Sequence, residues 1–166
     1  MSEDTAHPEP PAGDRKLVLI AEDEEPIADA LASIIADAGY APAVAHHGRK
    51  ALAVARARHP ALVITDLMMP YMGGADLIAA LHSDAANDGH AAPPIVLMTA
   101  VSRRMTPIVE ADALLHKPFN IEDVEELLRR FLGPPPAALD TQAAPDGARI
   151  RASSAQGEAG GERAGG

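Results

Sequence analysis

Short apolar runs alternate with amphipathic segments along most of this chain. The apolar runs are continuous, without the polar alternation of a half-exposed strand, so they are typical of parallel strands that are covered on both faces. The amphipathic segments between them are expected to be the covering helices, which predicts an α/β domain built around a parallel sheet. The expected strands are Lys16–Ala21, Ala41–Ala45, Ala61–Thr65, Ile95–Met98 and Ala113–Leu115.

Four amphipathic segments are expected to be helices. The first has Pro26 in its first turn and ends at Gly39, positions that proline and glycine favour. The second spans residues 48–58, the third follows Gly73-Gly74, and the last one ends the domain. Apolar residues at helical spacing mark their inner faces. These are Ile27, Leu31, Ile34 and Ile35; Leu52 and Val54; Leu77, Ile78 and Leu81; and Ile121, Val124, Leu128 and Phe131.

The connection between the fourth and fifth strands differs from the others. It must fit into residues 101–111, which include Pro107, so at most a short helix can form there. The order of elements is then (βα)5 with a shortened fourth helix, in one domain at residues 15–132. Residues 1–14 and 133–166 have many Pro, Gly or Ala and few large aliphatic side chains, so they are expected to be disordered tails.

Composition and charge narrow the function classes. The formal net charge of −10 repels phosphate backbones, and 2% aromatic residues without Trp offer few surfaces for stacking bases, so direct nucleic-acid binding is disfavoured. The absence of Cys excludes thiolate chemistry and disulfides. No apolar run approaches the roughly 20 residues of a membrane span, and the acidic N-terminus does not resemble a secretory signal. The protein is therefore expected to be cytoplasmic, with no membrane partner.

Acidic, hydroxyl and basic side chains follow the ends of four expected strands. Strands of a parallel sheet that are linked by right-handed crossovers end at one edge, so these side chains are expected to converge there. They are Glu22, Asp23 and Glu24 after the first strand, Asp66 after the third, Thr99 after the fourth and Lys117 after the fifth.

The convergence of these groups favours phosphoryl chemistry. Taken alone, the acidic run after the first strand is better explained as a solvated loop or as charges near a helix N-terminus. Its combination with Asp66 favours a cation site, because clustered carboxylates repel one another and oxygen ligands suit Mg²⁺. Mg²⁺ and Lys117 would neutralise a phosphoryl group, to which the Thr99 hydroxyl and the backbone N–H of Ala100 can donate hydrogen bonds. The pattern therefore predicts a phosphoryl group held on Asp66.

Four segments resemble motifs of the CheY-like receiver domains of two-component response regulators, and the likeness covers roughly residues 16–132. The resemblance implies a flavodoxin-like, doubly wound sheet with strand order 2-1-3-4-5, and a cis peptide bond before Pro118. Each motif alone is weak, but their order and their positions at strand ends make the resemblance specific. The motifs are Leu19–Pro26, Leu62–Pro70, Met98–Ala100 and Lys117–Phe119.

The resemblance also implies roles for these residues. Asp66 would accept a phosphoryl group from the phosphohistidine of a histidine kinase or phosphotransfer protein. Asp23, Asp66 and the backbone carbonyl of Met68 would bind Mg²⁺, with help from Glu22. Because no foldable pattern follows residue 132, a stand-alone receiver is expected, one that signals through protein partners and is not a classical enzyme.

Two alternatives remain at this point. An aspartyl phosphatase on a similar scaffold is disfavoured, because such enzymes carry a second Asp two residues after the first, where this chain has Met68. A receiver that acts without phosphorylation is suggested by two departures from the family pattern. Leu114 stands where an aromatic residue is usual, and only 17 residues separate Thr99 from Lys117. A third departure, Gly73 in place of the usual Asp, has no evident consequence.

Overall fold

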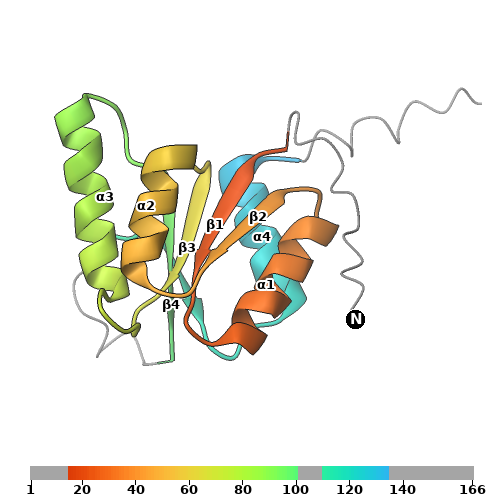
Figure 1. Ribbon diagram of the computed structural model, residues 1–166. Coiled ribbons are helices and arrows are strands. Elements are labelled where there is room, and N and C mark those ends of the chain that lie inside the picture. Colours follow the sequence, from red (N-terminus) through yellow and green to blue (C-terminus); the bar gives the residue numbers. More distant parts are fainter. Residues whose placement is uncertain (1–14, 101–109, 135–166) are drawn as a thin grey trace, which may run out of the picture.

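The computed structural model describes residues 15–100 and 110–134 as a three-layered α/β domain (Figure 1). A five-stranded parallel sheet forms the middle layer. In chain order the elements are β1 (Leu17–Ala21), α1 (Glu25–Asp37), β2 (Ala41–Ala45), α2 (Gly48–Arg58), β3 (Leu62–Asp66), α3 (Gly74–Asp88), β4 (Ile95–Thr99), β5 (Ala113–His116) and α4 (Ile121–Leu132). None of the helices in these residues is long and apolar enough to cross a bilayer.

The strands lie in the order β2-β1-β3-β4-β5, and all neighbouring pairs are parallel. The expected fold class, a flavodoxin-like doubly wound sheet, is therefore confirmed. The chain adds β2 on one side of β1 and then crosses to β3 on the other, so the winding reverses between β1 and β3. Ligands of such sheets bind at the carboxyl ends of the strands beside this point. The shortened fourth helix expected within residues 101–111 falls almost wholly outside the described residues.

Side chains of the strands alternate between two hydrophobic clusters, one on each face of the sheet. α1 and α4 cover one face, and α2 and α3 cover the other (Figure 1). Both clusters are built from strand residues with almost no exposed surface. Toward α1 and α4 these are Val18, Ile20, Leu62, Ile64, Val96 and Met98; toward α2 and α3 they are Leu19, Ala21, Val63, Ile95 and Leu97.

The inner face of α4 differs in part from the sequence expectation. Val124, Leu128 and Leu132 are buried, whereas Ile121 is 55% exposed, so its expected burial was wrong. Ile121 is the first residue of the helix, directly after the N-cap Asn120, whereas the buried residues lie further along it. The expected inner residue Phe131 packs against the edge of that cluster and is only partly buried.

The far end of α4 is tied to the start of the sheet. Lys16, just before β1, donates a hydrogen bond to the carbonyl of Leu132, and the buried Tyr40 hydroxyl donates one to the carbonyl of Gly133. Both acceptors are carbonyls at a helix C-terminus, which have no partner within the helix. These bonds fix α4 against β1 and β2.

Two glycines allow backbone segments to approach at the edge where the strands end. A Cβ atom on Gly74, the first residue of α3, would lie 2.2 Å from the carbonyl oxygen of Asp66. A Cβ atom on Gly48, the first residue of α2, would lie 2.4 Å from the carbonyl oxygen of Met72. The helices α2 and α3 can therefore begin directly against the loop that follows Asp66, the last residue of β3.

Replacing Gly74 tests this close approach. We expect Gly74→Ala to lower the free energy of unfolding by about 1–3 kcal/mol, because the added methyl group has to displace the backbone at Asp66. Gly73→Ala is the matched control, since a Cβ atom there meets only the Leu67 carbonyl at 3.2 Å. Urea denaturation measures both variants. Equal losses of stability in the two variants would show that the close approach of Gly74 to the Asp66 backbone does not determine the loss.

Candidate functional site

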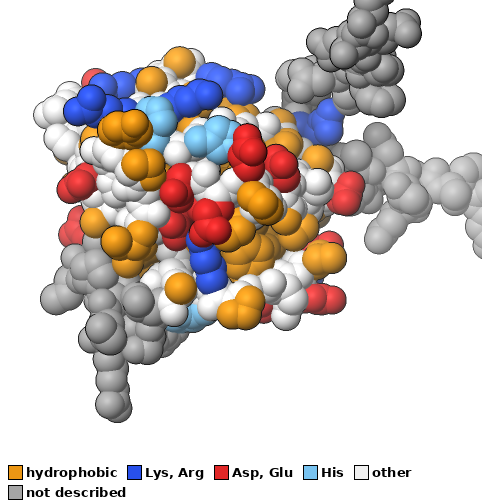
Figure 2. Space-filling model, turned by 60° about the horizontal axis from the view of Figure 1, so that its bottom comes forward, with side chains coloured by type: hydrophobic (Ala, Val, Ile, Leu, Met, Phe, Trp, Pro, Cys, Tyr) orange, Lys and Arg blue, Asp and Glu red, His pale blue; other side chains and the backbone are white. Residues whose placement is uncertain are grey.

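The ends of four strands bring acidic and basic side chains together at one edge of the sheet. Figure 2 shows this face, with a cluster of Asp and Glu side chains and a basic side chain directly beside it. β1 leads into Glu22 and Asp23, β3 ends at Asp66, β4 ends at Thr99, and β5 leads into Lys117. The convergence that the sequence predicted is therefore found in the fold.

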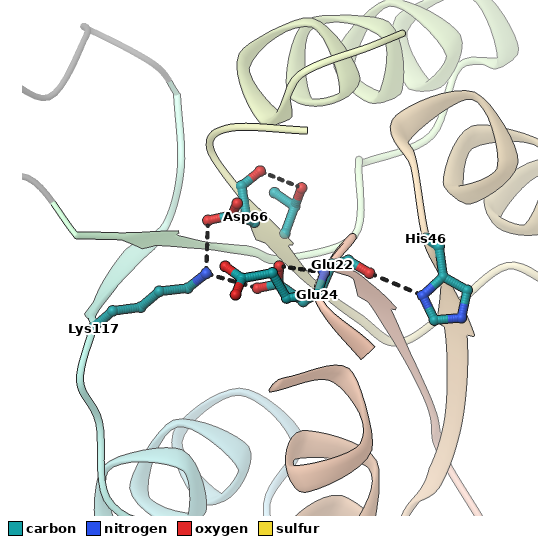
Figure 3. A network of polar contacts seen from close by, with 6 residues as sticks. Glu22, Glu24, His46, Asp66 and Lys117 are labelled. Carbon is teal, nitrogen blue, oxygen red and sulfur yellow. Dashed lines mark hydrogen bonds and ion pairs between the residues drawn. The ribbon is translucent and has the colours of Figure 1, made fainter. Parts of the chain in front are cut away.

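Lys117 connects two of the carboxylates. Its Nζ atom lies 2.8 Å from Glu22 Oε2 and 3.1 Å from Asp66 Oδ1 (Figure 3). The backbone N–H of Lys117 donates to the carbonyl of Thr99 at 2.9 Å, which holds the segment after β5 against β4. The Lys117–Pro118 peptide bond is cis, as the resemblance implied. The lysine side chain thus points into the site and supplies its positive charge.

Burial sets the electrostatics of this group. Glu22 is fully buried, and this burial raises the pKa of its carboxyl above the usual range, although hydrogen bonds from Lys117 and from the Glu24 backbone N–H oppose the change. Burial by itself would lower the pKa of Lys117, but its hydrogen bonds to Glu22 and Asp66 outweigh that effect and raise it. The ammonium group therefore stays charged between two acidic side chains.

Glu22, Asp23 and Asp66 form an acidic triad that resembles the Mg²⁺ site of receiver domains. Each residue offers one carboxylate oxygen, and these three oxygens lie within 4.8 Å of one another. Glu22 and Asp66 are buried, whereas Asp23 is exposed, so the triad opens to solvent on one side. A set of carboxylate oxygens with an open side suits Mg²⁺, which binds few protein ligands and keeps several waters.

The other expected site residues lie around this triad. Thr99 is 2% exposed and pairs in register with His116 of β5, which places it beside Lys117. Ala100 follows at the exposed end of β4. The side chain of Met68 is exposed, so any contact of this residue with a metal would come from its backbone. The hydrogen bond expected from the Ala100 N–H and the metal contact expected from the Met68 carbonyl stay predictions.

The structure places one further residue, His46, at the site and shows how Leu114 packs. His46 is half-buried, and its Nδ1 lies 3.2 Å from the carbonyl oxygen of Glu22 (Figure 3). The sequence signal for this contact is the position of His46 directly after β2, whose end lies at the same edge. Leu114, which replaces the usual aromatic residue, is half-buried and packs against the cluster under α2 and α3.

Together, the fold and this site define a doubly wound α/β domain with an acidic triad and a lysine at the carboxyl ends of its strands. The family model of the response regulator receiver domain matches residues 18–129, and the chain belongs to this family. It therefore contains a receiver domain of two-component signalling, and receiver domains as a class are signalling modules that partner with histidine kinases.

Curated relatives share the receiver region. The chain is 34% identical over 119 residues to the probable transcriptional regulatory protein TcrX of Mycobacterium tuberculosis, and 30% identical over 122 residues to the DNA-binding response regulator MtrA of Mycobacterium leprae. These matches cover 69% and 71% of this chain, but only 49% and 52% of the relatives. The chain thus spans about half the length of the curated relatives it matches.

Solved structures of single receivers match over nearly their whole length. The chemotaxis response regulator CheY4 of Vibrio cholerae is 30% identical with a TM-score of 0.63, and the match covers 71% of this chain and 99% of that one. The response regulator TrrA of Thermotoga maritima, solved in complex with Mg(2+)-BeF, is 26% identical with a TM-score of 0.62, covering 70% and 99%. Both matches support the receiver fold.

Removing the lysine tests the charge balance of the pocket. We expect Lys117→Ala to raise the pKa of Glu22 further, because the hydrogen bond that opposes the effect of burial is lost. Carboxyl ¹³C NMR titration of the metal-free protein measures this change. Asn120→Ala, which removes only the N-cap of α4, is the control and should leave the pKa of Glu22 unchanged. An unchanged pKa in Lys117→Ala would contradict the described ion pair.

Proposed function

We propose that Asp66 accepts a phosphoryl group from the phosphohistidine of a histidine kinase or phosphotransfer protein. One carboxylate oxygen of Asp66 attacks phosphorus, the phosphorus–nitrogen bond breaks, and its electron pair returns to the imidazole of the donor. The observation that carries this proposal is the position of Lys117 Nζ, 3.1 Å from Asp66 Oδ1. A cation at that position can stabilise the charge of a phosphoryl group on the same carboxylate.

Lys117, Thr99 and Ala100 are proposed to hold the transferred group. Lys117 would supply its charge, and Thr99 its hydroxyl from the adjacent end of β4. The backbone N–H of Ala100 would add a hydrogen bond at the exposed end of the same strand. Such preorganised donors lower the barrier because they are already aimed where charge develops.

The acidic triad is proposed to bind Mg²⁺ through Asp23 and Asp66, with the backbone carbonyl of Met68 as a further ligand and Glu22 in support. The donor set fits this ion, because the three carboxylate oxygens within 4.8 Å of one another are hard ligands. Bound there, Mg²⁺ would neutralise the equatorial oxygens of the phosphoryl group during transfer. Asp23 is the exposed member of the triad and would hold the ion at its solvent side.

Phosphorylation of Asp66 is proposed to shift an equilibrium between two surfaces that protein partners distinguish. The chain would act as a stand-alone receiver, with no direct contact to nucleic acid or membrane. The alternative is a receiver that binds partners without phosphorylation. Leu114, in place of the usual aromatic residue, favours that alternative only for the output step, because the groups around Asp66 are all present.

Removal of Asp23 tests the metal site. We expect Asp23→Asn to weaken Mg²⁺ binding by at least about tenfold, about 1.4 kcal/mol, because one of the clustered negative charges is lost. Isothermal titration calorimetry gives the dissociation constant. Asp29→Asn is the matched control, since it removes an exposed carboxylate from α1 outside the triad. Unchanged affinity in Asp23→Asn would contradict the proposed ligand set.

Chemical phosphorylation tests the acceptor. Acetyl phosphate and Mg²⁺ are expected to add one phosphoryl group, stable to acid and labile to base, which intact mass spectrometry detects. Asp66→Asn should abolish this adduct, because the nucleophilic carboxylate is gone, whereas Asp76→Asn, in the first turn of α3, should retain it. A chain that binds Mg²⁺ and yet forms no adduct with acetyl phosphate or phosphoramidate would favour the phosphorylation-independent alternative.

A further inference from the structure

All charged side chains of the helix α2 are basic, although the protein has a formal net charge of −10. It carries four basic side chains and no acidic one. Arg56 pairs with Asp84 of α3, with its Nε 2.7 Å from Oδ2. Arg49, Lys50 and Arg58 are exposed, and within the described residues their side chains have no ion-pair partner. The charges of these three residues are therefore available to attract anions that approach the helix.

Arg49 and Lys50, here named the basic pair, lie at the end of α2 that borders the phosphorylation site. His46, three residues before Arg49, contacts the backbone of Glu22 at 3.2 Å. Arg58 lies at the opposite end, roughly 12–14 Å further along the helix axis at 1.5 Å per residue. Figure 2 shows Lys and Arg side chains beyond the acidic cluster on the same face, with His side chains between the two.

The acidic triad creates an electrostatic problem for the proposed reaction. A site that attracts Mg²⁺ repels phosphodonors, because every donor of a phosphoryl group carries negative charge at neutral pH. Lys117 lies within the pocket and is already paired with Glu22 and Asp66. A long-range attraction for the donor has to come from charges that the pocket does not neutralise, and the basic pair is placed to supply it.

We propose that Arg49 and Lys50 steer the anionic phosphodonor toward Asp66. This inference rests on the proposed phosphorylation of Asp66 and adds residues outside the catalytic group. The basic pair raises the local concentration of an anionic donor at the mouth of the site, and it opposes the approach of Mg²⁺ for the same reason. Its effect is electrostatic and acts without a fixed contact, so it weakens as salt shortens the Debye length from about 10 Å at 0.1 M to about 3 Å at 1 M.

The chain offers a control matched in charge. The double variant Arg49→Gln/Lys50→Gln lowers the net charge by two at the site, and the single variant Arg58→Glu lowers it by two at the far end of the same helix. The initial rate of adduct formation is measured by intact mass spectrometry with subsaturating acetyl phosphate and saturating Mg²⁺. At an ionic strength of about 0.05 M, we expect the double variant to react about two- to threefold more slowly, and Arg58→Glu to react at nearly the wild-type rate.

Further measurements separate steering from a structural defect. In the double variant, the affinity for Mg²⁺ should rise by about twofold, so that its dissociation constant falls, whereas the rate of phosphorylation decreases. The rate difference should disappear near about 1 M salt. It should also be smaller with phosphoramidate, which carries less negative charge than acetyl phosphate. The swapped variant Arg49→Lys/Lys50→Arg keeps both charges and should retain the wild-type rate.

Three outcomes would overturn the proposal while leaving phosphorylation of Asp66 intact. These are equal rates in the double variant and the wild type, equal slowing in Arg58→Glu, and a rate loss that persists at high salt. Failure of the proposed function gives a different result, since the wild-type chain itself would then form no adduct with acetyl phosphate or phosphoramidate.

Discussion

The ammonium group of Lys117 lies between the carboxylates of Glu22 and Asp66, and the remaining architecture is arranged so that these three groups can meet. They come from the ends of β5, β1 and β3. In the strand order β2-β1-β3-β4-β5, β1 and β3 are neighbours and only β4 lies between β3 and β5. A shift of one residue in β3 would turn the Asp66 side chain to another face, since strand side chains alternate. The hydrophobic clusters on both faces fix this register, so the packing of the core determines the geometry of the site.

The same three groups link the proposed phosphorylation of Asp66 to the rest of the domain. A buried carboxylate such as Glu22 is costly unless a cation compensates it, and Lys117 is shared between that carboxylate and Asp66. A phosphoryl group on Asp66 would change the charges that surround Lys117, because the lysine would then have a new anionic partner. The segment after β5 begins at Lys117 and leads directly into α4, so a change in the partners of this lysine bears on the position of that helix.

Much of this arrangement could be predicted from the sequence, for identifiable reasons. Continuous apolar runs determine buried parallel strands, and parallel strands end at one edge, so the meeting of Asp66 with Lys117 followed from topology alone. The contact of His46 with the Glu22 backbone was missed, because the position of His46 after the second strand indicates that it lies at this edge but does not give the direction of its ring. The burial of Ile121 was predicted wrongly, because helical periodicity gives the direction of a side chain and not how far the facing core extends along the helix. Residues 101–109 lie outside the described chain, so the expected short fourth helix stays a prediction.

Opposite electrostatic demands meet at this sheet edge. The pocket has to be negative to attract a divalent cation, and the reaction proposed for it needs an anion to approach the same carboxylate. A single cluster of charges cannot satisfy both demands at long range, because its far field has one sign. The fold separates them in space: the carboxylates and their lysine lie at the strand ends, and cations without an ion-pair partner among the described residues lie on the helix that starts beside them. Gly48 lets that helix begin in direct contact with the loop after β3, so backbone packing sets how near its charges come to Asp66.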